Sequence, residues 1–422
     1  MGNLKVCFLT GEYPPMQGGV ADHTARLAHH LAGLGLEVAI LTSHKAGSNH
    51  KSQISNIKYQ ISGLQPPTIH PIITAWGLGC WRQIGRFLAE HCPDVLHIQY
   101  QAAAFDLGGW VNWLPWWLRQ GRWGHLPHHR PRLVVTFHDL RVPYLFPKAG
   151  PLRWRSILAL ARYADAAIVT NVEDQQTFLK SQIPNLPGLT ARTGKSQTSL
   201  IPLGSNVEPC PPADYDRSRW RARLGLDDNA LVLAYFGFLS ESKGGEDLIL
   251  ALDRLVQRGY NAHLLMIGGQ VGDVDATNLA YAGRVRSLVE VRGLTERVRW
   301  TGYMSPEEVS AHLLAADGVV MPYRDGVSFR RTTFIAALRH SCPVVTTQPT
   351  VPLTELCDGV NVLLVPPRDV DALAGAVARL AGDAELRARL SAGAAALGQR
   401  FDWEQIARQT VAVYTEKVTE CE

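Results

Sequence analysis

The sequence predicts an α/β protein made of two doubly wound domains, and three observations carry this prediction. Short apolar runs alternate with helical segments along the chain, as in βαβ units that form a parallel sheet. The alternation stops in a segment rich in proline and polar residues, "SLIPLGSNVEPCPPADYD", and then starts again. The length of 422 residues allows two or three domains at about 100 to 200 residues each.

The first half opens with a complete βαβ unit. An apolar strand, "LKVCFLT", leads through the loop "GEYPPMQGG" to the helix "VADHTARLAHHLAGLG" and the strand "EVAILTS". Later apolar runs that end in polar residues are also predicted as parallel strands: "PDVLHIQY", "RLVVTFHDL" and "AAIVTN". Because ligands bind at the carboxyl ends of such strands, we expect the polar residues there to face a functional site.

The second half repeats this plan. The segment "ALVLAYFGFLSESKGGEDLILALDRL" is predicted as strand, loop and helix, and further strands follow at "AHLLMIGG", "VRWTGY", "DGVVMPY", "CPVVTT" and "NVLLVPP". We therefore predict a first domain at residues 1–205, a second at residues 206–400 and a last helix within residues 401–422.

Composition is typical of a soluble globular protein, with 46% apolar and 19% charged residues. No apolar run approaches the roughly 18 residues that a membrane-spanning helix needs, and the first residues lack the basic and apolar regions of a signal peptide. The seven cysteines are scattered, with no CxxC spacing, which disfavours a zinc site and a disulfide framework. These features favour a reducing cytoplasm.

Charge is shared unevenly between the halves. Residues 1–205 hold 19 Lys and Arg against 10 Asp and Glu, whereas the remainder holds 23 against 28. Residues 108–132 also contain five of the eleven tryptophans, together with Arg119, Arg122, Arg130 and Arg132. Tryptophan beside arginine suits peripheral contact with the inner face of a membrane or a lipid-linked acceptor. A helix packed on the first domain, followed by a basic loop, is the alternative.

A dinucleotide dehydrogenase is disfavoured by two absences. Neither glycine loop contains the full GxGxxG pattern, and the second strand ends in "LTSHK", with no acidic residue to bind a ribose hydroxyl.

Six segments, taken in order, resemble the GT-B glycosyltransferases, and specifically glycosyltransferase family 4. They are "GGVADHTARLAHHLAGLGLEVAILT", "TFHDL", "FGFLSESKGGEDLILAL", "LMIGG", "VRWTGYMSPEEVSAHLLAADGVVMPY" and "ALRHSCPVVTT". The resemblance covers nearly the whole chain. It implies two Rossmann-like domains facing a central cleft, and transfer of a sugar from a nucleotide donor with retention of anomeric configuration. The segment "FDWEQIARQTVAVY" resembles the family's last helix, which crosses back to the first domain.

The resemblance implies several donor contacts. Lys243 and Gly244 stand, after Gly237, where the family places a phosphate-binding Lys-Gly at a helix start. Gly18 and Gly19 precede the first helix and lack the Cβ that would obstruct the approach of a backbone amide to the donor phosphate or the acceptor. The alternatives are a solvated lysine and an ordinary turn.

The resemblance also implies contacts with the sugar and the base. The family uses a histidine at the position of His138 to hydrogen-bond the transferred sugar, and a satisfied structural histidine is the alternative. We expect Asp139 to be its polar neighbour rather than a general base. Base contacts fall near the "TGY" loop, at Gly302 and Tyr303.

Two departures from the family pattern concern charge. The family has an arginine after the first glycine of the Lys-Gly loop, where this chain has Phe238. It also has two glutamates with seven residues between them, around the sugar and ribose, at positions that Ser328 and Ala336 occupy here. Asp325 could reach the sugar if the loop is rearranged.

The segment "DGVSFRRTTFIAALRHSCPVVTT" offers a replacement for the missing arginine. Ser328 is expected as the N-cap of its helix, so the N–H groups near Arg330 to Thr332 should point outward, and with Thr333 this helix start suits phosphate. Arg330 or Arg331 could then supply the cation absent at Phe238. A solvated helix end is the alternative.

We therefore expect an active, retaining glycosyltransferase that uses a nucleotide-diphosphate sugar and a glycan, lipid-linked or small-molecule acceptor. No cofactor, no metal and no nucleic acid are expected, since fixed cations and backbone amides can stabilise the leaving diphosphate. The alternatives are a catalytically silent member that binds nucleotide or glycan, and a sugar-nucleotide epimerase of the same fold.

Overall fold

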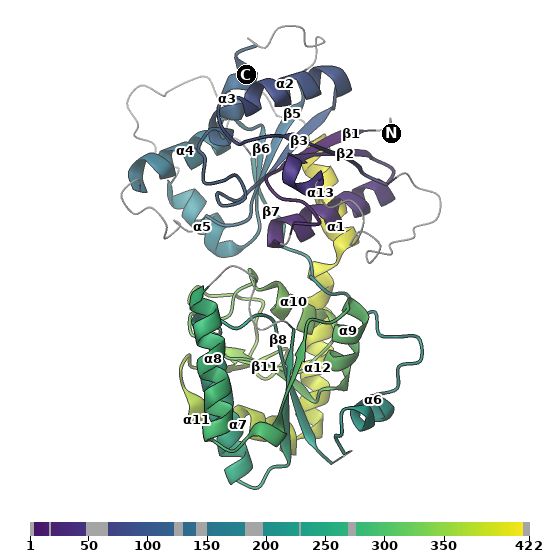
Figure 1. Ribbon diagram of the computed structural model, residues 1–422, viewed down its shortest axis with the longest axis vertical. Coiled ribbons are helices and arrows are strands. Elements are labelled where there is room, and N and C mark those ends of the chain that lie inside the picture. Colours follow the sequence, from purple (N-terminus) through teal and green to yellow (C-terminus); the bar gives the residue numbers. More distant parts are fainter. Residues whose placement is uncertain are drawn as a thin grey trace. The chain divides into compact units, whose positions relative to one another are not determined.

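The computed structural model describes residues 4–16, 18–47, 66–121, 130–140, 150–181, 197–227, 229–268 and 276–416 (Figure 1). The chain forms two compact units, one of Met1–Leu203 with Trp403–Glu422 and the other of Gly204–Asp402. The sequence-based boundaries fell after residues 205 and 400. The last helix belongs to the first unit. Each unit is described by itself below.

The first unit contains a parallel sheet in the order β3-β2-β1-β4-β5-β6-β7. Its strands are β1 (Lys5–Thr10), β2 (Glu37–Ser43), β3 (Thr68–Ile73), β4 (Val95–Tyr100), β5 (Arg132–Phe137), β6 (Ala166–Val169) and β7 (Gln197–Leu200). Its helices are α1 (Gly19–Gly33), α2 (Cys80–His91), α3 (Leu114–Arg119), α4 (Gly150–Tyr163), α5 (Val172–Ser181) and α13 (Trp403–Thr415), with 3-10 turns η1 (His44–Gly47) and η3 (Val111–Trp113).

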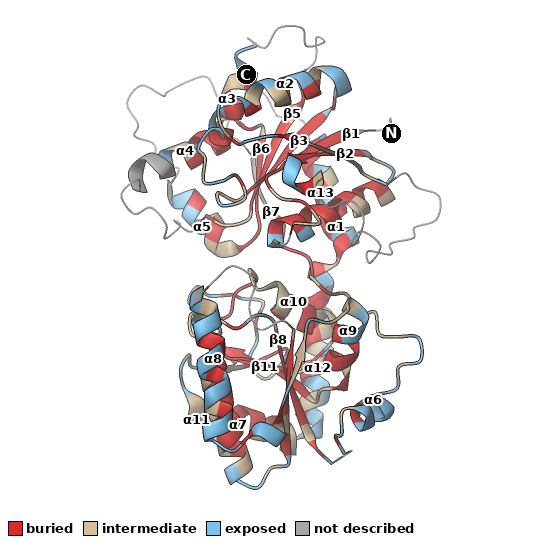
Figure 2. Ribbon diagram, viewed as in Figure 1, coloured by how far each residue is buried: buried red, intermediate tan, exposed pale blue. Residues whose placement is uncertain are grey.

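Both faces of this sheet are buried, which explains why its central strands are nearly all apolar. One face packs against α1 and α13, in a cluster that includes Phe8, Leu31 and Ile406. The other packs against the side of α2, α3 and α4, with Phe87 and Leu160 in its core. The central strands are accordingly buried along their length (Figure 2).

The sequence did not predict β3 and β7, the two edge strands. The residues of β3, "TIHPII", are mostly half-buried and include a proline, while β7, "QTSL", is short and polar. Edge strands are covered less than central ones, so they lack the continuous apolar run that identified the others.

The second unit contains a parallel sheet in the order β10-β9-β8-β11-β12-β13. Its strands are β8 (Leu231–Phe236), β9 (Ala262–Ile267), β10 (Val298–Gly302), β11 (Gly318–Met321), β12 (Val344–Thr347) and β13 (Leu363–Val365). Its helices are α6 (Arg217–Arg223), α7 (Gly245–Gln257), α8 (Ala276–Val291), α9 (Pro306–Ala315), α10 (Thr332–Arg339), α11 (Val370–Gly382) and α12 (Ala384–Gly398), with 3-10 turns η5 (Glu241–Lys243), η6 (Thr295–Arg297) and η7 (Gln399–Phe401).

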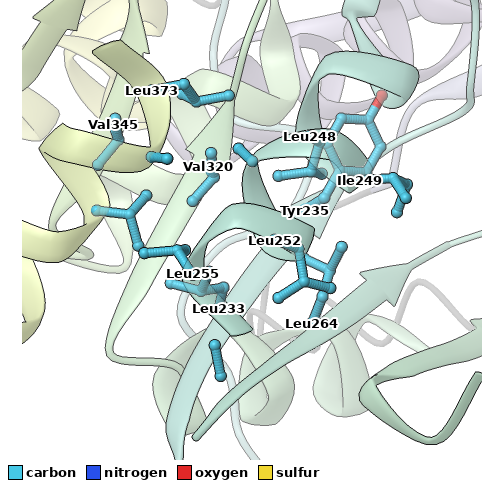
Figure 3. Close-up of a cluster of buried hydrophobic side chains, with 14 of the residues drawn as sticks. Leu233, Tyr235, Leu248, Ile249, Leu252, Leu255, Leu264, Val320, Val345 and Leu373 are labelled. Atoms are coloured by element: carbon cyan, nitrogen blue, oxygen red, sulfur yellow. The ribbon is translucent and has the colours of Figure 1, made fainter. Parts of the chain in front are cut away.

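The core of this unit lies between its sheet and α7, α8 and α11. Figure 3 shows Leu248 and Leu252 of α7 over Leu233 of β8 and Leu264 of β9, with Val320 of β11 on the same side. Each fully buried leucine contributes roughly 1.5 to 3 kcal/mol relative to an exposed one, and this holds α7 on the sheet.

Side-chain hydrogen bonds cap the starts of α9, α11 and α12 in this unit. At α9 the Ser305 hydroxyl accepts from the Glu308 N–H (3.2 Å), and the Glu308 carboxylate accepts from the Ser305 N–H (3.0 Å). Asp369 and Asp383 cap α11 and α12 in the simpler way, through one backbone N–H each. A cap of this kind stabilises a helix by about 1 kcal/mol.

Each sheet reverses its strand order at one point, between β1 and β4 in the first unit and between β8 and β11 in the second. Loops at the carboxyl ends of these neighbouring strands lead to opposite faces of the sheet, and ligands of doubly wound proteins bind in the resulting crevice. We therefore expect ligands to bind near these two reversal points.

Candidate functional site

A cluster of charged and polar side chains lies at the reversal point of the second sheet. The guanidinium of Arg331 binds both carboxylate oxygens of Asp325, at 2.8 and 2.7 Å, and lies 5.0 Å from the centre of the Tyr323 ring. Lys243 donates from Nζ to the carbonyl of Phe238, at 2.8 Å. Arg331 and Asp325 also act electrostatically on Lys243, so these predicted residues come together.

The backbone around this cluster is close to the two cations. A Cβ placed on Gly237, which follows β8, would lie 3.7 Å from Nζ of Lys243 and 3.2 Å from Cγ2 of Thr333. Gly244 has a φ of 69° and a Cβ there would overlap the carbonyl of Pro322, so the position requires glycine. Gly244 is also the N-cap of α7, whose first amides follow directly.

The environment lowers the basicity of Lys243. Burial, and then the positive charge of Arg331, lower its pKa from 10.5 to about 8, while Asp325 opposes the shift. A dianionic group bound beside the ammonium would favour its charged form. The cluster is therefore suited to bind an anion.

Arg324, which the sequence did not single out, connects the two loops of this site. Its guanidinium donates to both oxygens of Asp247 (2.9 and 2.7 Å) and to Glu246 (3.0 Å), in the first turn of α7. Its backbone N–H donates to the carbonyl of Ser242 (2.8 Å). The loop after β11 is thereby bound to the loop that carries Lys243.

The prediction that Ser328 caps α10 is wrong. The N-cap of α10 is Arg331, without a side-chain cap, and Thr332 and Thr333 begin the helix. The Ser328 hydroxyl and carbonyl accept from the N–H groups of Arg330 (3.4 Å) and Arg331 (3.1 Å), so neither N–H points outward. The physical reason is the neighbouring Phe329 ring, which packs on the rings of Phe334 and Phe401 and delays the helix.

The two positions at which the family has glutamates are buried. Ser328 is 6% exposed and Ala336, within α10, is fully buried. Asp325 is held in an ion pair with Arg331, as described above.

Three neighbouring strands of the second sheet end in glycines with positive φ, namely Gly237 (124°), Gly268 (108°) and Gly302 (71°). Gly268 and Gly302 pair with each other through a backbone bridge, and a Cβ on Gly268 would lie 3.8 Å from the backbone nitrogen of Gly237. The ring of Tyr303, the next residue, is 90% exposed. The sequence predicted Gly237, Gly302 and Tyr303 but not Gly268.

A separate hollow of about 580 Å³ lies on the same unit. It is lined by α7, α8 and Arg324, including Glu246, Arg284 and Arg292. None of the predicted site residues lines it, so we do not assign the donor to it.

In the first unit, the start of α1 already binds a carboxylate of the chain. Glu12 accepts from the Ala21 N–H at 3.3 Å, and burial raises the pKa of Glu12 despite this bond. A Cβ on Gly18 would overlap the Glu12 carboxylate, whereas one on Gly19 would meet nothing within 4 Å. A side chain at Gly18 would therefore displace the Glu12 carboxylate from its present position.

His138 follows β5, the strand next to β4 of the reversal point, and belongs to a polar network. Its Nε2 lies 2.7 Å from Oε1 of Gln99, and its ring meets that of His23 edge-on at 4.8 Å. Burial, and then the charge that His23 and His97 would carry, lower the pKa of His138 well below its usual value. Gln99 and His97 were missed, although their spacing of two on one strand places them on the same face.

The tryptophan-rich segment forms part of the surface of the first unit. Trp110, Trp113 and Trp116 are 45%, 40% and 38% exposed. Of the arginines, Arg119 and Arg130 both bind the Asp165 carboxylate, at 2.8 and 2.9 Å. Arg132 lies in β5, while Arg122 and Trp123 lie outside the described residues. Among the described helices, none combines the length and apolarity that a bilayer crossing requires.

Comparison with known proteins gives matches over most of the chain. The family model of glycosyl transferases group 1 matches residues 216–396, and that of the glycosyl transferase 4-like domain matches residues 18–187. The D-inositol 3-phosphate glycosyltransferase of Streptomyces bingchenggensis is 25% identical over 94% of this chain and 85% of its own length. The alpha-D-kanosaminyltransferase of Streptomyces kanamyceticus is 29% identical over 67% of this chain and 70% of its own.

Among solved structures, that of Anabaena Alr3699/HepE in complex with UDP is similar, with a TM-score of 0.71, 20% identity and coverage of 97% of this chain and 98% of that one. Two Rossmann-like units with these sheet orders make the chain a GT-B protein, which confirms the predicted fold class. The two family models together span most of its length. The chain belongs to the GT-B glycosyltransferases of the family 4 type, as the six sequence segments predicted.

Proposed function

We propose that this glycosyltransferase moves a sugar from a nucleoside-diphosphate donor to an acceptor hydroxyl, with retention of the anomeric configuration. The observation that carries the proposal is the pair of cations, Lys243 and Arg331, at the reversal point of the second sheet. When the bond between the anomeric carbon and the diphosphate oxygen breaks, negative charge grows on the diphosphate. Fixed cations stabilise that charge more in the transition state than in the bound donor.

The remaining donor contacts are assigned within the same unit. We assign the phosphates to Lys243, Arg331 and the amides that begin α7 and α10, after Gly244 and at Thr332 to Thr333. The base is assigned to the loop at Gly302 and Tyr303. The similar Anabaena protein was solved in complex with UDP and with UDP-glucose, which makes UDP-sugars the first donors to test.

The first unit is assigned to the transferred sugar and the acceptor. His138 is the proposed partner of a sugar hydroxyl. Because Glu12 already binds the start of α1, we assign Gly18 and Gly19 to the acceptor side rather than to the donor phosphate. A carboxylate at that place can accept hydrogen bonds from hydroxyl groups.

The proposed reaction does not need a metal ion, because two side-chain cations and backbone amides meet the charge of the diphosphate. Transfer should therefore proceed at the same rate in excess EDTA. A rate that falls with EDTA and returns with magnesium or manganese would contradict this part of the proposal.

The acceptor is a glycan, a lipid-linked molecule or a small molecule, and peripheral contact with a membrane is proposed for the first unit. The exposed Trp110, Trp113 and Trp116 support such a contact. So does the excess of nine positive charges over residues 1–205, the difference between 19 basic and 10 acidic residues.

The deciding experiment incubates the purified chain with UDP-glucose, UDP-galactose, UDP-N-acetylglucosamine or GDP-mannose, with and without candidate acceptors. D-inositol 3-phosphate belongs among these, because the relatives' names include it. Acceptor-dependent release of nucleoside diphosphate supports a transferase, and the anomeric coupling constant of the product reports retention or inversion. Binding without release would favour a silent member, and release without acceptor would favour an epimerase.

A further inference from the structure

Buried hydrogen bonds connect the last helix of the first unit to His138. The hydroxyl of Tyr414, on α13, lies 2.6 Å from Nδ1 of His97. Nε2 of His97 lies 3.2 Å from the side-chain nitrogen of Gln99, and Oε1 of Gln99 lies 2.7 Å from Nε2 of His138. Tyr414, His97 and Gln99 are all buried, so water does not compete for these bonds.

Both imidazoles in this chain of bonds are neutral at pH 7. Burial lowers the pKa of His97 to about 3 and that of His138 well below its usual value. A neutral imidazole carries one N–H donor and one nitrogen acceptor, so the position of its proton decides what it can bind.

The partners of His97 determine where its proton lies. The amide nitrogen of Gln99 can only donate, so Nε2 of His97 is an acceptor, and its single lone pair is shared with the Thr136 hydroxyl, which lies at 2.7 Å. The proton of His97 is then on Nδ1 and is donated to the Tyr414 hydroxyl.

The same amide determines the proton of His138. Oε1 of Gln99 can only accept, so His138 donates from Nε2. Nδ1 of His138 is left with its lone pair and can accept a hydrogen bond from a hydroxyl group.

We propose that Tyr414 and Gln99 are positioning residues for His138: they hold its proton on Nε2, so that Nδ1 accepts a hydrogen bond from a hydroxyl of the bound sugar. The sugar contact rests on the proposed function, whereas the position of the proton does not. In this arrangement the last helix, α13, helps to fix the tautomer of His138 through Tyr414.

The alternative arrangement exchanges every donor and acceptor. In it Gln99 is turned over, its amide nitrogen donates to His138, and His138 carries its proton on Nδ1. Replacing Tyr414 by phenylalanine favours this arrangement. A proton on Nδ1 of His97 then has no acceptor in place of the hydroxyl, whereas on Nε2 it still has Thr136.

The test is a ¹⁵N NMR measurement of the histidine tautomers in the full chain, without ligand. His138 should carry its proton on Nε2 in the wild type and on Nδ1 in Tyr414→Phe. The matched control is Thr410→Val, because this buried hydroxyl of α13 donates within its own helix, to the carbonyl of Ile406 (2.8 Å). It should leave the wild-type tautomer.

A second variant tests whether the effect passes through the amide. In Gln99→Met, which preserves most of the side-chain volume, adding Tyr414→Phe should no longer move the proton of His138. A wild-type His138 protonated on Nδ1 would overturn the proposal without any variant. A tautomer that is unchanged in Tyr414→Phe would overturn the role of α13.

Ligand binding separates this inference from the proposed function. With UDP-glucose and UDP as probes, Tyr414→Phe should lower the affinity for UDP-glucose by about tenfold, as expected for the loss of one hydrogen bond, and leave the affinity for UDP unchanged. If UDP-glucose does not bind the wild type, the proposed donor fails while the tautomer result still stands. Equal weakening of both probes would indicate a structural role and would contradict the positioning role.

Discussion

Lys243 should make diphosphate binding depend on pH. Since its pKa is lowered to about 8 in the ligand-free protein, raising the pH from 7 to 8.5 removes much of its charge, and UDP should lose affinity relative to uridine. Lys243→Met should weaken UDP by roughly ten- to a hundredfold, as expected for a charge-assisted hydrogen bond, and abolish this pH dependence. Calorimetry with both ligands measures the effect.

The control for Lys243 is Lys5→Met, at an exposed lysine of β1. It should change neither affinity. An equal loss of UDP and uridine binding in Lys243→Met would show that the lysine supports the fold of the loop rather than the diphosphate.

Arg331 is expected to act in catalysis and Arg330 is not. Single-turnover transfer at saturating donor should fall by roughly a hundredfold to a thousandfold in Arg331→Ala, as for a lost oxyanion donor, because charge on the diphosphate grows toward the transition state. Arg331→Lys should restore only part of the rate, since an ammonium lacks the planar guanidinium fork that can donate from two nitrogens to two phosphate oxygens.

The ion pair with Asp325 provides the necessary control. Arg331→Ala also leaves the Asp325 carboxylate without its cation beside the diphosphate, and the repulsion between the two negative groups weakens binding of the donor. In the double variant with Asp325→Asn that repulsion is gone, so the remaining defect measures the arginine itself. Wild-type rates in both Arg330→Ala and Arg331→Ala would leave the diphosphate to Lys243 and backbone amides.

At the scale of elements, the surface formed by η3 and α3 is expected to bind membranes. Vesicles that contain phosphatidylglycerol should retain the protein at low ionic strength and release it with salt, because screening removes the attraction to the basic first unit. Combined replacement of Trp110, Trp113 and Trp116 by serine should abolish binding, as measured by vesicle sedimentation.

The matched control is Val291→Ser, which removes an apolar side chain that is 81% exposed at the end of α8 in the other unit. It should leave sedimentation unchanged. If the wild type does not sediment even at low salt, the tryptophans serve only the packing of the first unit, as Trp117 does by stacking on Trp81 at 5.5 Å.

At the scale of the whole molecule, buried histidines should make the first unit sensitive to acid. Burial lowers the pKa of His23 to about 4 and of His97 to about 3, so the unfolded chain binds protons near pH 6.5 that the folded chain does not. The first unit therefore has the full stability contributed by its neutral histidines above pH 6.5, and it loses this stability as the pH falls below 6.5. For His23 the full loss is about 3 kcal/mol.

The urea midpoint should accordingly be lower at pH 5 than at pH 7, although Glu12 and Asp22, whose pKa values are raised, act in the opposite direction as the pH falls. Tryptophan fluorescence reports mainly the first unit, which holds nine of the eleven tryptophans. His23→Gln should reduce the difference between the two pH values. Equal midpoints at pH 5 and 7 would contradict the burial of neutral histidines.

Much of this molecule could be predicted from neighbouring residues alone. The central strands, their order along the chain and the glycine that opens α7 depend on local patterns, because side-chain periodicity and backbone conformation are set within a few residues. Lys243 and Gly244 could be placed at a helix start for that reason, and six such segments in order identified the family.

Local rules failed where packing between distant segments decided the outcome. Serine is a preferred N-cap residue, and Ser328 was expected to cap α10. The ring of Phe329 packs instead on Phe401, which is 72 positions further along the chain, and α10 begins after Arg331. Edge strands β3 and β7 were missed because β3 is mostly half-buried and contains a proline, while β7 is short and polar.

Partners far apart in sequence were decided only by the tertiary structure. Tyr414 meets His97 across 317 positions, and Arg324 meets Asp247 across 77. Polar side chains in a strand or helix can be assigned to a face by periodicity, but which group stands opposite depends on strand register and on which helix covers that face. The sequence therefore determined the kind of protein and the place of Lys243 before a helix start, whereas the orientation of His138 and the pairing of Arg331 required the packed sheets.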